Sequence, residues 1–120
     1  MPITSRRLPG LAVAAIASLG AGAVHAAATG IHAEHVGLAR LFVVAAVAQL
    51  GDGLWALVRP AKLAAWALVG VNGAAVVGWL ATRLTGISWI SGLETREAAQ
   101  FADTSCALMG AVAAGAALAA

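Results

Sequence analysis

The chain has 120 residues, which is enough for one domain. Hydrophobic residues make up 62% of it and charged residues 10%, and the mean hydropathy is +0.92. A soluble domain of this size leaves much of its surface in water and needs polar residues to cover it. The composition therefore excludes a soluble globule and a disordered chain. The seven basic side chains are too few and too scattered for a nucleic-acid-binding patch. We expect a membrane protein whose main surroundings are the lipid bilayer.

Four stretches are long and apolar enough to cross a bilayer, which takes about 20 mostly apolar residues in a helix. They run over residues 8–28, 37–58, 63–82 and 99–120. Short connections force neighbouring spans to be antiparallel. No run of residues alternates with the period of a β-strand. We therefore expect an all-α fold, a four-helix transmembrane up-down-up-down bundle, with residues 1–120 forming a single domain.

The basic residues outside the spans predict the orientation, because Lys and Arg favour the cytoplasmic side. If both ends are inside, the inner side holds four basic residues and no acidic one: Arg6, Arg7, Arg59 and Lys62. The outer side then holds two basic and three acidic residues: Arg83, Arg96, Glu34, Glu94 and Glu97. We expect a multi-pass protein of the cell membrane with both termini in the cytoplasm.

An alternative interpretation of the first span is a cleavable signal peptide. Arg6 and Arg7, the apolar run after them and the small residues around His25 also fit that pattern. The run from Leu8 to Val24 is longer than the hydrophobic region of most signal peptides, which has about 7–15 residues. We therefore prefer the transmembrane interpretation; cleavage would leave three spans.

Polar residues inside the spans are expected to pair with each other. Gln49 lies ten residues before Arg59, and Asn72 lies ten residues after Lys62. At ~1.5 Å per residue both amides are ~15 Å from the turn, near the middle of the membrane. An amide facing lipid is costly, so we expect the two to meet. Asp52 lies near the inner interface, where either snorkelling toward water or pairing with Arg59 or Lys62 would satisfy it.

Small residues recur at intervals of four in two of the spans, which favours close contact between helices. The first span has Gly10, Ala14, Ser18 and Gly22, and the third has Gly70, Ala74 and Gly78. We expect both stripes to pack against a neighbouring helix.

Three ionisable residues lie at a similar depth near the outer end of the spans: His25, Arg40 and Asp103. Ionisable residues inside a membrane are candidates for function, and each needs a partner. We expect Arg40 and Asp103 to form an ion pair with His25 beside them and His35 above them.

A possible metal site lies in the same region. Imidazole and carboxylate groups suit Zn, Cu, Fe or Ni, and four such residues lie close together in the sequence: His25, His32, Glu34 and His35. The alternative is that the histidines are hydrated groups at the membrane interface. No motif indicates a phosphate-binding loop, a serine nucleophile or a paired-carboxylate active site. We therefore expect no enzyme and no cofactor other than this divalent metal.

Several short pieces of the chain are similar to a known group of proteins. The pieces include His25, the Glu34-His35 pair, Ala48-Gln49, Val71-Asn72-Gly73, Thr82-Arg83-Leu84-Thr85-Gly86 and Ala102-Asp103. Together they resemble small uncharacterised four-helix integral membrane proteins of high-GC Gram-positive bacteria. The group usually has Pro where this chain has Ala33 and Ser88. The resemblance implies the same topology and the same polar residues, and it implies no particular reaction.

Two functions fit these observations. In the first, the outer cluster of His, Glu and Asp residues binds or passes a small cation or a proton. In the second, the protein is a structural or accessory subunit that packs against a larger membrane complex or a second copy of itself. The second function would use the polar residues inside the spans for assembly only.

Overall fold

The computed structural model describes residues 3–96 and 98–120, so that Glu97 lies outside the described part. Within that part the fold is all-helical. The short 3-10 helix η1 (Ser5–Arg7) leads into α1 (Leu8–Ile31), which is followed by α2 (Val36–Val58), α3 (Lys62–Leu84) and α4 (Phe101–Ala119). All four α-helices are long and apolar enough to cross a membrane. This confirms the predicted fold class and makes the chain a multi-pass membrane protein.

The ends of the helices follow local sequence signals. Pro9 lies in the first turn of α1, where its missing N–H costs nothing, and Pro60 separates α2 from α3. A capping box between Gln100 and Asp103 begins α4. Gly86 has a φ of 76°, which ends α3 just after Leu84. Helix α3 therefore continues to Leu84, two residues beyond the end of the predicted span at residue 82.

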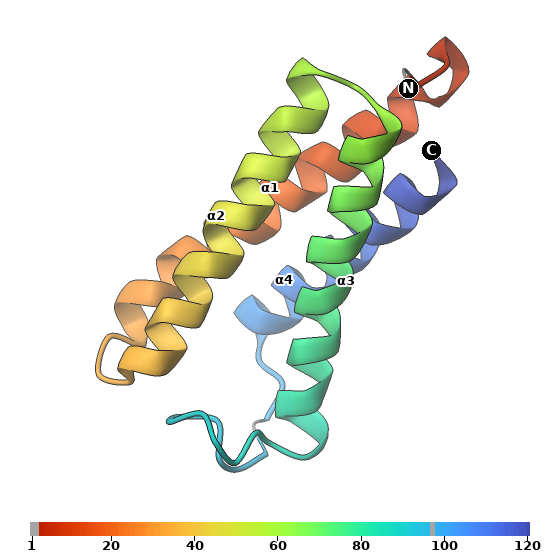
Figure 1. Ribbon diagram of the computed structural model, residues 1–120. Helices are drawn as coiled ribbons and strands as arrows, with labels where there is room; N and C mark the ends of the chain where they lie inside the picture. Colours follow the sequence, from red (N-terminus) through yellow and green to blue (C-terminus); the bar gives the residue numbers. More distant parts are fainter. Residues whose placement is uncertain (1–2, 97) are drawn as a thin grey trace.

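The chain ends lie at one end of the bundle. Figure 1 shows both termini and the turn over residues 59–61 there, and we call this the terminal end. Arg7 Nη1 donates a hydrogen bond to the carbonyl oxygen of Ala120 over 3.1 Å. The connection over 32–35 and the one between α3 and α4 lie at the opposite end, which we call the loop end.

Helix α1 holds the bundle together. It packs most extensively on α2 and then on α4, while α3 packs mainly on α4 and less on α2. In Figure 1, α2 and α3 diverge from their shared turn toward the loop end. The helices α2 and α4, both described in full, do not approach within 8 Å between Cα atoms. The fourth helix is therefore a neighbour of α1 and α3 only.

The terminal half of the bundle is tightly closed. Its core consists of small and branched apolar residues with exposed fractions of 0–6%: Leu11, Ala14, Ala15, Ala56, Ala64, Ala65, Leu68 and Ala117. These alanines let the backbones approach closely, which favours helix packing in lipid.

The two predicted stripes of small residues differ in how closely they pack against a neighbouring helix. In the first, Ala14, Ser18 and Gly22 are buried, and a Cβ atom on Gly22 would lie 2.8 Å from the side chain of Leu50. In the third span the prediction of close packing is wrong, because Gly70 and Gly78 have nothing within 4 Å of a Cβ position. At Gly78 the reason is the divergence of α2 and α3, which leaves open space between the two helices.

Candidate functional site

A cavity of about 640 Å³ occupies the loop-end half of the bundle. All four helices line it, and residues of the connection between α3 and α4, such as Leu93, line it as well. Much of its wall is made of small or apolar side chains, among them Ala48, Ala75, Gly78 and Gly110. The diverging helices α2 and α3 and these small residues leave space that larger side chains would fill.

A chain of hydrogen bonds between buried side chains lies behind the cavity, and Gln49 is the member of it that lines the cavity wall. Gln49 Nε2 donates to Asn72 Oδ1 over 3.0 Å, which confirms the predicted contact between the two amides. Asn72 Nδ2 donates to Ser18 Oγ over 3.0 Å and to the carbonyl oxygen of Leu68 over 3.1 Å. Ser18 Oγ in turn donates to the carbonyl oxygen of Gln49 over 2.9 Å. The three polar side chains have no exposed surface and join α1, α2 and α3.

His25 extends this chain into the cavity. Its Nδ1 atom lies 2.6 Å from Gln49 Oε1, and its ring is part of the cavity wall. Cys106 Sγ of α4 lies 3.7 Å from His25 Nδ1 and 3.9 Å from Nε2. Depth along the membrane does not by itself predict the contact with Gln49. A signal for it exists, because His25 follows Ser18 by seven residues, which places both on one face of a helix.

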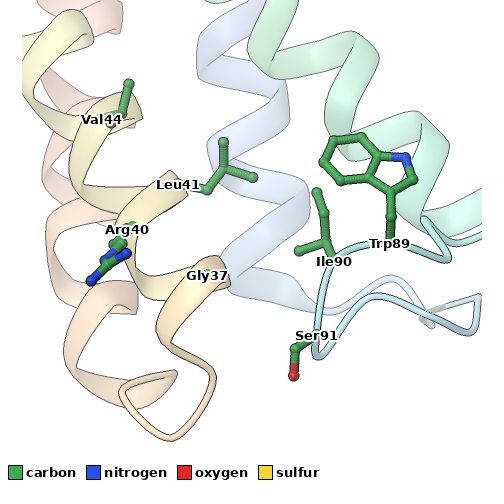
Figure 2. Close-up of a pocket in the computed structure, with 7 residues that line it drawn as sticks. All are labelled: Gly37, Arg40, Leu41, Val44, Trp89, Ile90 and Ser91. Atoms are coloured by element: carbon green, nitrogen blue, oxygen red, sulfur yellow. The ribbon is translucent and has the colours of Figure 1, made fainter.

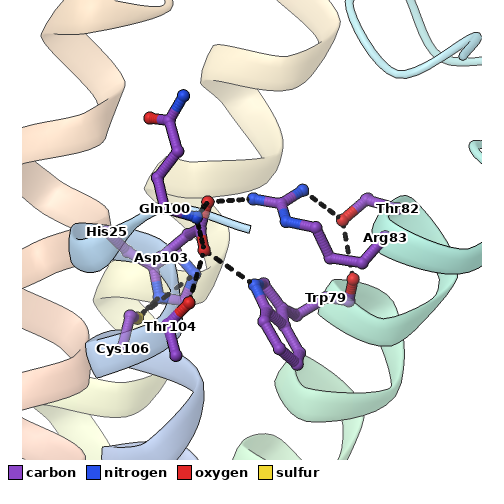
Figure 3. A network of polar contacts seen from close by, with 8 residues as sticks. All are labelled: His25, Trp79, Thr82, Arg83, Gln100, Asp103, Thr104 and Cys106. Atoms are coloured by element: carbon purple, nitrogen blue, oxygen red, sulfur yellow. Dashed lines mark hydrogen bonds and ion pairs between the residues drawn. The ribbon is translucent and has the colours of Figure 1, made fainter. Parts of the chain in front are cut away.

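A second polar group lies in the cavity wall nearer the loop end, and Figure 3 shows it. The guanidinium of Arg83 in α3 pairs with the carboxylate of Asp103 in α4. Trp79 Nε1 donates to Asp103 Oδ1 over 3.2 Å. Arg83 Nη1 also donates to Thr82 Oγ1 over 2.7 Å. The Arg83 and Asp103 side chains are 16% and 25% exposed, so the pair is mostly shielded from solvent.

The predicted ion pair between Arg40 and Asp103 is wrong. Arg40 belongs to α2, which has no Cα atom within 8 Å of a Cα atom of α4. Asp103 instead meets Arg83, which follows the predicted span over 63–82 but lies in the last turn of α3. His25 is not part of this pair either, because its Nδ1 is turned to Gln49.

Arg40 lies on the outside of the bundle beside a shallow groove of about 530 Å³ (Figure 2). The groove runs between α2 and the connection after α3, and Leu41, Ile90 and Trp89 contribute to it. Figure 2 shows the Arg40 side chain pointing away from Ile90 and Trp89. The groove therefore has no convergent polar groups.

The residues predicted to bind a metal do not converge. His35 Nδ1 lies 3.1 Å from Ser91 Oγ, while the His32 ring packs on Phe42 with a centroid distance of 5.3 Å. The carboxylate of Glu34 is exposed and lies 3.8 Å from His35 Nε2. Within residues 3–96 and 98–120, no group of three or more His, Cys, Asp and Glu side chains is placed to hold a metal. His25 and His32 both pack on the ring of Phe42, with centroid distances of 5.6 and 5.3 Å, while His35 turns to Ser91.

Pairing is one of two arrangements expected for Asp52, and the described residues do not show it. Asp52 is half-buried in α2, and among the described residues it forms no ion pair with Arg59 or Lys62. It lies on the opposite side of Gln49 from the cavity, toward the terminal end.

Comparison with known proteins adds no relative to these findings: no family model matches the chain, and no curated protein or solved structure matches it significantly.

Proposed function

We propose that this protein binds a small, uncharged amphipathic molecule in the cavity between α2 and α3. The observation that carries the proposal is the composition of the cavity wall. A volume of about 640 Å³ lies within the range of ligand sites, about 300–1,000 Å³. Such sites are mostly apolar with a few placed polar groups. Here the apolar wall lies between the His25–Gln49 contact at its deep end and the Arg83–Asp103 pair nearer the loop end.

The charges favour an uncharged ligand over a cation. Asp103 is the one carboxylate among the described residues that line the cavity, and Arg83 neutralises it. A cation at Asp103 would also meet the positive charge of Arg83 at short range. Binding a cation there would require breaking a pair that Trp79 supports as well.

The closed terminal half argues for binding rather than passage. The core around Leu11, Ala15 and Leu68 seals the bundle between the hydrogen-bond chain and the terminal end. Asn72, the deepest polar side chain, bonds to the carbonyl oxygen of Leu68, where the core begins. A proton or an ion would find no further polar side chain in this core. A ligand would therefore enter and leave from the loop-end half.

The divergence of α2 and α3 favours access from the bilayer (Figure 1). Val71, Ala74 and Gly78 of α3 line the cavity opposite Leu41, Val44 and Ala48 of α2. A molecule dissolved in the lipid phase could place its polar group at His25 and leave its apolar part along these walls.

The test uses fluorescence quenching in lipid nanodiscs. A variant that keeps Trp79 and carries Phe at positions 55, 66 and 89 reports on the cavity, because Trp79 lines it. The probe is a long-chain phenol that carries bromine, which quenches tryptophan on contact. We expect saturable quenching of Trp79.

Two matched substitutions on α3 separate cavity binding from contact with bulk lipid. Gly78 lines the cavity and Gly70 does not, and both have open space at the Cβ position. Gly78→Leu should abolish the saturable quenching, whereas Gly70→Leu should leave it unchanged. Equal quenching in the two variants, or quenching that only rises linearly with the probe in the parent protein, contradicts the proposal. A helix of another protein or of a second copy seated in the cavity would give that negative result.

A further inference from the structure

The hydrogen-bond chain behind the cavity has a fixed direction, and this direction determines which part of His25 is free. Asn72 supplies the starting point. The carbonyl oxygen of Leu68 can only accept a hydrogen bond, so the group 3.1 Å from it must be the amide nitrogen of Asn72. The amide oxygen of Asn72 therefore faces Gln49.

The orientation of Asn72 determines the orientation of Gln49 and, through it, the position of the hydrogen on His25. Because Asn72 Oδ1 is an acceptor, Gln49 must turn its amide nitrogen toward it, over 3.0 Å. The amide oxygen of Gln49 then faces His25, 2.6 Å from Nδ1. An oxygen acceptor at that distance requires a hydrogen on Nδ1. Ser18 agrees with these orientations, because its hydroxyl donates to the carbonyl oxygen of Gln49 and accepts from Asn72 Nδ2.

A neutral His25 therefore carries its hydrogen on Nδ1 and a lone pair on Nε2. Among the described residues, Nε2 has no nitrogen or oxygen partner within hydrogen-bond distance, and Cys106 Sγ lies 3.9 Å from it. The thiol of Cys106 has another acceptor, the carbonyl oxygen of Ala21, at 3.5 Å. The imidazole thus offers one unused hydrogen-bond acceptor, and its ring forms part of the cavity wall.

We infer that the ligand of this cavity carries a hydroxyl group that donates a hydrogen bond to His25 Nε2, as in a phenol or a long-chain alcohol. The inference rests on the proposed function and names the chemical class of the ligand. A ligand whose polar groups are all hydrogen-bond acceptors would leave Nε2 without a partner. It would form no hydrogen bond at the polar end of the cavity. Asn72, Gln49 and Ser18 act as positioning residues, because they hold His25 in the tautomer that accepts.

The experiment compares two probes that differ in one place, where a methyl group in the second replaces the hydroxyl hydrogen of the first. They are the brominated long-chain phenol and its methyl ether, measured by quenching of Trp79 in the single-tryptophan protein. One neutral hydrogen bond contributes about 1 kcal/mol, so the phenol should bind about fivefold more tightly than the ether. The ether should still bind, because the apolar wall is the same for both.

Three variants then assign the preference to His25. His25→Leu removes the acceptor and should reduce the ratio of the two affinities to about one. His25→Gln can donate to Gln49 and still offer an oxygen to the cavity, so it should keep the preference for the phenol. Cys106→Ala removes the neighbouring thiol and should also keep it.

The outcomes are distinguishable. If both probes bind equally to the parent protein, the inference is overturned while the proposed function stands. If neither probe binds in a saturable way, the proposed function itself fails. A preference that survives His25→Leu shows that another residue receives the hydroxyl. The comparison of the two probes in the parent protein needs no variant and decides the matter even if His25→Leu does not fold.

Discussion

Arg83 in α3 and Asp103 in α4 form the ion pair that joins these two helices near the loop end of the bundle. Their side chains come from the last turn of one helix and the first turn of the next. Asp103 also accepts from the indole of Trp79 and from the backbone N–H of Gln100. The carboxylate therefore both begins α4 and attaches it to α3.

The first prediction concerns this pair. Asp103→Asn keeps an oxygen that can accept from Gln100 but removes the charge, so the loss of stability reports mainly on Arg83. We expect the free energy of unfolding to fall by about 1.5–3 kcal/mol, the usual contribution of a hydrogen bond to a charged group. Unfolding by a strong detergent, followed by circular dichroism, measures it. Arg83→Gln should have little further effect when Asp103 is already Asn.

Arg40→Gln is the matched control for these measurements, because Arg40 is exposed and lies on α2, which has no Cα atom within 8 Å of a Cα atom of α4. It should leave the stability unchanged. A larger loss of stability for Arg40→Gln than for Arg83→Gln would favour the ion pair between Arg40 and Asp103 that the sequence predicts.

The second prediction concerns Gln49 and Asn72. Each single substitution to Leu leaves the other amide buried without its partner, while the double substitution removes both polar groups. We expect each single variant to be destabilised by about 1 kcal/mol or less, as is usual for such bonds between membrane helices. The two effects should not add in a double-mutant cycle. Val47→Ala, on the exposed face of α2, serves as a control. Its effect on the free energy of unfolding should add to that of Gln49→Leu or of Asn72→Leu. Strict additivity of Gln49→Leu and Asn72→Leu would argue against their contact.

The third prediction uses two glycines of the same helix. A Cβ atom on Gly53 would lie 2.8 Å from the backbone carbonyl oxygen of Ala15, so Gly53→Ala must push α1 and α2 apart. We expect a loss of about 1–3 kcal/mol, as for overpacking of a core. Gly51 has nothing within 4 Å, so Gly51→Ala should leave the stability unchanged or raise it slightly through its better helix propensity. Thermal unfolding in detergent compares the two. Equal melting temperatures would contradict the close approach of α1 and α2.

The fourth prediction concerns the orientation in the membrane. Both chain ends lie at one end of the bundle, so they should face the same compartment. The basic residues near that end, Arg6, Arg7, Arg59 and Lys62, favour the cytoplasm. A reporter fused after Ala120 should be active only in the cytoplasm, and one inserted after Trp89 only outside. Activity on the same side for both would exclude a fourth span between them.

The first span should remain in the mature protein. It supplies Ser18 and His25 to the hydrogen-bond chain and Leu11, Ala14 and Ala15 to the core. The mass of the purified protein tests this, since cleavage after Ala26 would remove most of α1.

The sequence determined what depends on composition and on distance along a helix. Its hydropathy fixed four spans, because a helix must be apolar for about 20 residues to cross a bilayer. The rise of ~1.5 Å per residue fixed the depth of Gln49 and Asn72 relative to the turn at residues 59–61. A short turn makes α2 and α3 antiparallel, so equal depth was enough to predict that these two amides meet.

Only the tertiary structure decided which helices are neighbours and which way each side chain faces around its helix axis. Depth alone placed His25, Arg40 and Asp103 in one layer, but α4 packs on α1 and α3 and not on α2. Asp103 therefore meets Arg83, and His25 turns to Gln49. Hydropathy and helical rise constrain position along the membrane normal, and they leave the order of helices in the membrane plane open. That order depends on how small residues such as Gly22 and Gly53 let particular pairs of helices approach.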